Sequence, residues 1–151
     1  VVDKIIANSS EEIVKSQDVL DQLDEVLNIN IFNLTDAMSA KNPKETIDTY
    51  LKMAAANEDL FMIYHMIIRQ IRNLIGVKSL YLNGYNDTFM MKNLGIGSYE
   101  LKKIKGYSRN FSLTELLNIH SRIFDMEYRQ KSVDFDMKLE LLLLLREISA
   151  K

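Results

Sequence analysis

Residues that interrupt helices are scarce along the whole chain. Its 151 residues include a single proline, Pro43, and five glycines. These two residue types are the ones that most strongly end or weaken a helix. In addition, no stretch alternates apolar and polar residues at period two over the length needed for a sheet. The sequence therefore predicts an all-α fold, a multi-helix bundle whose helices are joined by short turns.

Local signals place the helices. Starts are predicted at Asn8, at Ser16 and near Asn30, and the helix from Asn30 ends before Pro43 because proline disfavours helical geometry in the residue that precedes it. Further helices are predicted over residues 44–55, 57–82, 87–94, 98–110, 112–131 and 136–148.

Four residues are given specific roles at helix starts. Asn57 and Ser98 are predicted N-caps, and Ser112 with Glu115 is predicted to form a capping box. These assignments fix where three of the helices begin.

Two of the predicted helices are unusually apolar. In residues 57–82, apolar side chains cover more than half of the circumference and leave a narrow polar stripe. A helix of this kind is packed on at least two sides, so we expect it at the centre of the bundle. The last helix contains Leu139 and five consecutive leucines, residues 141–145, which point to all sides. We expect it to be buried by its own domain or by another protein chain.

Charge is unevenly distributed. Residues 1–60 carry 12 acids and 5 Lys or Arg, a balance of −7, whereas residues 61–131 carry 11 Lys or Arg and 5 acids, a balance of +6. This split fits either nucleic-acid contact in the middle of the chain or ordinary solvated faces. Charge alone does not decide between them.

The residue patterns of catalytic and cofactor sites are missing. The chain has no cysteine, and its two histidines, His65 and His120, have no second ligand at metal-binding spacing. The glycines at Gly95 and Gly97 lack the lysine of a phosphate loop. No catalytic, cofactor-binding or metal-binding residue is therefore predicted. Neither a signal peptide nor a membrane-spanning run is seen, so a cytoplasmic protein without membrane contact is expected.

One segment allows a different function. Residues 87–110 predict a short helix, a glycine turn and a basic helix, as in a helix-turn-helix DNA-binding regulator. Against this alternative, the start of the second helix offers no Arg, Asn or Gln to reach base edges.

The order of segments along residues 14–151 resembles a known family. The resemblance is carried by six segments in register: residues 14–23, residues 30–38, residues 67–78, residues 94–107, residues 111–116 and the leucine run at residues 139–145. In these segments the chain is similar to the C-terminal, collar region of the delta subunit of the bacterial DNA polymerase III clamp loader.

This resemblance implies a fold and a role. Residues 1–28 would be flanking helices that remain from the lid domain, and residues 29–151 would form the helical collar. The collar would be a non-catalytic oligomerisation scaffold without cofactors, although the parent protein would belong to a polymerase holoenzyme. Its partners would be the tau/gamma and delta-prime subunits, and the sliding clamp would be reached only through an N-terminal domain.

The resemblance also implies contact residues. Tyr99, Lys102, Lys103 and Phe135 are expected where the collar meets single-stranded template DNA, because an aromatic ring stacks on an unpaired base and lysines neutralise phosphates. The residues expected at the interface between subunits are Arg69, Arg72, Leu139, Leu142 and Leu143.

Overall fold

The computed structural model describes residues 18, 19, 21, 22 and 29–151. The chain divides into two compact units, Val1–Phe32 and Asn33–Lys151. The predicted helix start at Asn8, and the residue at the predicted start Ser16, lie outside the described residues. The predicted domain boundary between residues 28 and 29 stays a prediction.

The second unit is built from helices, and no strand occurs among the residues that the structure describes. The all-α prediction is confirmed. Residues 33–39 are helical, and six helices follow in the order α2 (Pro43–Ala55), α3 (Leu60–Leu82), α4 (Asp87–Leu94), α5 (Ser98–Ser108), α6 (Leu113–Arg129) and α7 (Met137–Ser149).

Most helix ends follow from local sequence. Pro43 stands at the first position of α2, where a missing N–H costs nothing, and the Asn42 side chain accepts a hydrogen bond from the Glu45 N–H at 3.2 Å. Asn83 follows the last residue of α3 as its C-cap. Helix α4 ends at Gly95, whose φ of 67° is left-handed and therefore suits glycine.

Two predicted caps are wrong. Helix α3 is capped by Asp59, whose carboxylate accepts from the Phe61 N–H at 2.9 Å, because Asn57 adopts a φ of 57° in the turn that follows α2. Ser98 is the first residue of α5, and the N-cap is Gly97, which has no side chain to offer. In both places two polar or small residues compete for one role, and turn geometry decides between them.

Only one of the two hydrogen bonds of the predicted capping box at the start of α6 forms. Ser112 Oγ accepts from the Glu115 N–H at 3.0 Å, as predicted. The Glu115 carboxylate instead pairs with Lys41, which precedes α2, and the Lys41 ammonium also donates to the Ala150 carbonyl at 3.0 Å. Lys41 therefore joins the start of α6 to the end of α7.

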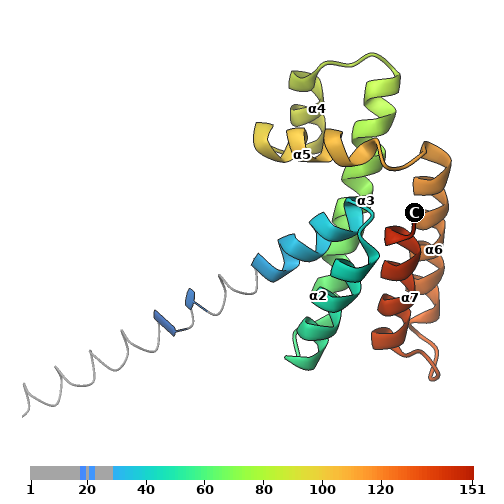
Figure 1. The fold of residues 1–151 in the computed structure, drawn as a ribbon. Helices are drawn as coiled ribbons and strands as arrows, with labels where there is room; N and C mark the ends of the chain where they lie inside the picture. Colours follow the sequence, from blue (N-terminus) through green and yellow to red (C-terminus); the bar gives the residue numbers. More distant parts are fainter. Residues whose placement is uncertain (1–17, 20, 23–28) are drawn as a thin grey trace, which may run out of the picture. The chain divides into compact units, whose positions relative to one another are not determined.

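Helix α3 is the centre of the unit, as its apolar pattern predicts. It packs against α4, α5, α6 and α7, while α2 packs against α7 (Figure 1). At Gly76 a Cβ atom would lie 2.6 Å from Leu94 Cδ2, so the missing side chain lets the end of α4 approach closely. The buried side chains along α3 include Ile63, Tyr64, Ile67, Ile71, Leu74 and Val77.

Candidate interface with neighbouring subunits

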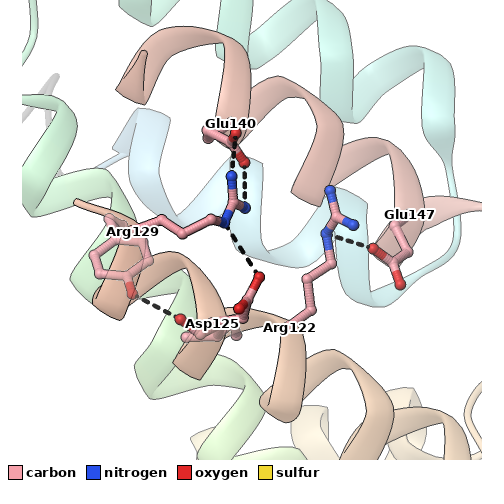
Figure 2. A network of polar contacts seen from close by, with 7 residues as sticks. Arg122, Asp125, Arg129, Glu140 and Glu147 are labelled. Carbon is pink, nitrogen blue, oxygen red and sulfur yellow. Dashed lines mark hydrogen bonds and ion pairs between the residues drawn. The ribbon is translucent and has the colours of Figure 1, made fainter. Parts of the chain in front are cut away.

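Helices α6 and α7 are locked together by charged side chains. Arg129 donates two hydrogen bonds to the Glu140 carboxylate, at 2.8 and 2.9 Å, and a third to Asp125 at 3.1 Å (Figure 2). Two turns earlier on α6, Arg122 Nε lies 2.8 Å from Glu147 Oε2. The pairs join residues 122 and 129 of α6 to residues 147 and 140 of α7, so the two helices run antiparallel. Both pairs are partly exposed and support this register, whereas the packing of apolar side chains decides which faces are turned outward.

The Arg129–Glu140 pair shifts the ionisation of Glu140. The hydrogen bond from Arg129 is the main cause that holds the pKa of Glu140 below its ordinary value, although partial burial acts in the opposite direction. The carboxylate is therefore charged over the whole physiological range.

The leucine-rich helix α7 has two apolar faces. Leu141, Leu144 and Leu145 are fully buried in the bundle. On the opposite side Leu139 is 49% exposed and Leu143 39% exposed. Leu142 is half-buried beside them. We define these three residues, Leu139, Leu142 and Leu143, as the α7 stripe. Burial by its own domain thus accounts for only part of this helix.

A second apolar stripe lies on α6. Leu117 is 50% exposed, Phe124 70% and Tyr128 76%, and the three residues follow one another at intervals of seven and four. That spacing places them on one face of a helix. We define them as the α6 stripe. None of the predicted interface residues belongs to this stripe, although its spacing is present in the sequence.

The two arginines expected at the interface lie on the polar stripe of α3. Arg69 donates two hydrogen bonds to Glu100 of α5, at 2.7 and 3.3 Å, and Arg72 is exposed. The Arg69 guanidinium is therefore already held by a partner within the chain. The two arginines come from a different helix than either stripe.

The residues expected to contact single-stranded DNA fall into two groups. Tyr99 is 76% exposed at the start of α5, and Lys102 is exposed on the same helix. Phe135 is half-buried in the connection between α6 and α7, with the Arg129 guanidinium 6.0 Å from its ring centre. Figure 1 shows the start of α5 and that connection at opposite ends of the second unit. The two aromatic rings therefore do not form one platform.

Lys103 has a partner within the protein. Its ammonium donates to Asp36 at 2.7 Å and lies 5.6 Å from the centre of the Tyr99 ring. Burial is the largest single influence on the Lys103 pKa and lowers it, but the hydrogen bond and charge of Asp36 outweigh it, so the pKa is raised. Lys103 is thus a fixed charge that supports the start of α5.

Other kinds of site are not found in the part of the chain that the structure describes. His65 and His120 are exposed on separate helices, and the described residues contain no cluster of His, Cys, Asp or Glu that could hold a metal ion. Among these residues, no helix has both the length and the apolar character that crossing a membrane requires.

Comparison with known proteins gives one consistent result. Residues 28–148 match the family described as DNA polymerase III delta subunit, C-terminal domain. The chain is 26% identical over 119 residues to the DNA polymerase III subunit delta of Bacillus subtilis, an alignment that covers 79% of this chain and 34% of that protein. The solved structure of the Bacillus subtilis clamp loader delta protein YqeN superposes with a TM-score of 0.70 at 26% identity, over 80% of this chain and 35% of that one. The chain thus spans about a third of each relative. Residues 87–110, considered above as a helix-turn-helix, lie inside the matched range.

Proposed function

The chain belongs to the family formed by the C-terminal domains of DNA polymerase III delta subunits, and from this premise we propose that it is a non-catalytic oligomerisation domain that holds its parent protein in the clamp-loader ring. Its proposed partners are the tau/gamma and delta-prime subunits. In this role the domain performs no chemistry, and its work is to present surfaces that neighbouring subunits recognise.

The presence of two apolar stripes on two different helices carries this proposal. A protein within a ring contacts its two neighbours through two different surfaces, because head-to-tail interfaces are not self-complementary. The α6 stripe and the α7 stripe are two such surfaces on one unit. The side chains of the α6 stripe are 50–76% exposed. In the α7 stripe, Leu139 and Leu143 are 49% and 39% exposed, and Leu142 is half-buried. Aromatic and aliphatic anchors of this kind dominate the binding energy of protein interfaces.

The experiment is a mixing titration in analytical size-exclusion chromatography, with the tau/gamma and delta-prime collar domains added singly and together. One double variant, Leu139→Ser with Leu143→Ser, removes the α7 stripe, and a second, Phe124→Ser with Tyr128→Ser, removes the α6 stripe. Phe61→Ser is the matched control, because Phe61 is 55% exposed on α3 but belongs to neither stripe.

Each double variant should lose one neighbour, with affinity reduced roughly tenfold or more, and keep the other. The control should bind both neighbours like the unaltered chain. Phe124 and Tyr128 are mostly exposed, so their replacement should change the free energy of unfolding by no more than about 0.5 kcal/mol per site. Leu139 and Leu143 are about half buried, so their replacement should cost about 1 kcal/mol per site. Urea unfolding of each variant alone therefore separates lost binding from lost folding. An unaltered chain that elutes alone at micromolar concentrations with both partners present would remove the basis of the proposal.

A second role in DNA contact is favoured by one observation, the 76% exposure of the Tyr99 ring next to Lys102 and Lys103. We propose that Tyr99 stacks on an unpaired template base while Lys102 neutralises a phosphate, and that Phe135 makes a separate contact. Tyr99→Ala combined with Lys102→Ala should lower the affinity for oligo(dT) by about 1–3 kcal/mol in a fluorescence anisotropy titration. Equal affinity of the variant and the unaltered chain would contradict this role.

A further inference from the structure

A groove lies between the last turns of α3 and the C-terminal half of α5, away from both stripes. Its volume is about 210 Å³, and it is lined by Val77, Lys78, Tyr81, Leu82, Lys105 and Arg109, with Ser108 beside them. Three of these lining residues are cations and none of them is acidic.

Two of the three cations are held by contacts within the chain. The Lys78 ammonium donates to the Ser108 carbonyl at 3.0 Å, and Lys105 pairs with Asp87 at 2.8 Å. Arg109 is the C-cap residue of α5, and it is exposed. Because Asp87 offsets one of the three charges, the groove and its immediate surroundings retain a charge of about +2, which favours an anionic partner.

The groove also has an apolar wall. Tyr81 is 65% exposed and Leu82 63% exposed, while Val77 is fully buried. Large side chains at this exposure leave apolar area that a partner could cover. A purely inorganic anion would leave this wall in water, so the expected ligand combines negative charge with an apolar group.

We propose that this groove binds an acidic peptide segment of a partner protein, through one aromatic or aliphatic side chain flanked by carboxylates. The apolar side chain would lie against Tyr81 and Leu82, and the carboxylates would pair with Arg109 and Lys78. The inference is independent of the function proposed above, because it uses no residue of the α6 or α7 stripe.

The shape and lining of the groove favour a peptide over a nucleic acid. Its volume is below the roughly 300–1,000 Å³ of common ligand pockets, so it suits one or two side chains. Proteins that bind single strands follow the backbone over about four or more nucleotides and stack successive bases on several rings. The lining residues of the groove include one ring, that of Tyr81, and their cations converge on a single hollow.

The test uses the complete chain and a fluorescein-labelled peptide with one phenylalanine between Asp and Glu residues. The comparison ligands are the same peptide with serine for phenylalanine, the same peptide with Asn and Gln for the acids, and oligo(dT). The variants are Arg109→Glu and Tyr81→Ser. Lys92→Glu is the matched control, because Lys92 is an exposed residue of α4 and its replacement makes the same change in net charge outside the groove.

Anisotropy titrations should show binding of the acidic phenylalanine peptide that weakens roughly tenfold with either groove variant, and by less than about twofold with Lys92→Glu. Both altered peptides should bind roughly tenfold more weakly than the original. The proposal is overturned by equal weakening in Lys92→Glu, by equal binding of the serine peptide, by no binding at millimolar peptide, or by oligo(dT) that binds more tightly and is lost with Arg109→Glu.

Discussion

Replacement of Lys41 tests how the turn before α2 is held to the start of α6 and the end of α7. Its side chain is 9% exposed, yet the residue lies in the short turn before α2. The ammonium pairs with Glu115 at the start of α6, donates to the Ala150 carbonyl at the end of α7, and lies 4.2 Å from the centre of the Phe111 ring. Lys41→Ala removes all three contacts at once.

The expected cost is about 2 kcal/mol. A hydrogen bond from a charged donor contributes about 1.5–3 kcal/mol. The cation–π contact adds about 0.5–2 kcal/mol. The Glu115 side chain is 38% exposed, so its ion pair is screened by water and contributes about 1 kcal/mol or less. Two effects oppose these contributions: burial of the ammonium costs desolvation energy in the unaltered chain, and water solvates Glu115 and Ala150 in the variant. They reduce the expected cost of Lys41→Ala to about 2 kcal/mol.

The backbone conformation at Lys41 predicts an unusual order of stability for two variants at this position. Its φ is 59°, a left-handed conformation that costs a residue with a Cβ atom roughly 1–2 kcal/mol and costs glycine almost nothing. Lys41→Gly should therefore be more stable than Lys41→Ala by about 1 kcal/mol, although glycine is usually the more destabilising of the two.

Urea unfolding followed by circular dichroism measures these differences. Lys105→Ala is the matched control, because the Lys105–Asp87 pair is on the surface, with side chains 32% and 58% exposed, and should change the free energy of unfolding by no more than about 1 kcal/mol. Two results would refute the reasoning: a Lys41→Ala variant within about 0.5 kcal/mol of the unaltered chain, or a Lys41→Gly variant less stable than Lys41→Ala.

Two further predictions concern stability. Gly95→Ala should destabilise the chain by about 1 kcal/mol through its φ of 67° alone, since among the described residues no atom beyond its own chain neighbours lies within 4 Å of the added Cβ atom. At Gly106, inside α5, there is also space for a Cβ atom, so Gly106→Ala should stabilise the chain by about 0.5–1 kcal/mol. Thermal melts measure both variants, and a change of stability in the same direction for the two would contradict this prediction. Burial, with a smaller contribution from Asp136, raises the pKa of Tyr50 to about 12. The unfolded chain then loses this proton first, so stability should fall as pH rises from about 10 to about 12. Tyr50→Phe should flatten that fall in urea titrations at several pH values, while it costs about 1 kcal/mol at pH 7 through the lost 2.7 Å hydrogen bond to the Lys138 carbonyl. A fall of the same steepness in the variant would exclude Tyr50 as its cause.

Sequence reasoning identified the residues at the α7 stripe because they stand within one leucine-rich helix. Leu139, Leu142 and Leu143 are turned outward, and the other leucines of the run fill the core. Whether they contact a neighbouring chain is still a prediction. The α6 stripe was missed, although Phe124 and Tyr128 are more exposed than any leucine of α7, because an apolar residue at helical spacing is normally assigned to the core.

For the lysines near Tyr99, by contrast, sequence reasoning predicted a role without knowing which residues lie nearby in the fold. Lys103 looked like a side chain available to a phosphate, but Asp36, which is 67 residues away in sequence, binds it. Similarly, Glu115 was expected to complete a capping box within its own helix, and Lys41 takes its carboxylate. In both cases a residue distant in sequence binds the side chain, so the side chain is not available for the role predicted from its neighbours in sequence.

Local sequence was enough to determine the helical class, most helix boundaries, the central position of α3 and the resemblance to the delta collar. These features depend on interactions within about four residues and on the spacing of apolar side chains, both of which can be read along the chain. The folded chain was needed to show which leucines face out, how Gly76 admits Leu94, and that Lys41 meets residues 74 and 109 positions away. Such contacts depend on how the helices are rotated and packed against one another, and the sum of many weak contacts fixes that packing only when the whole core is assembled.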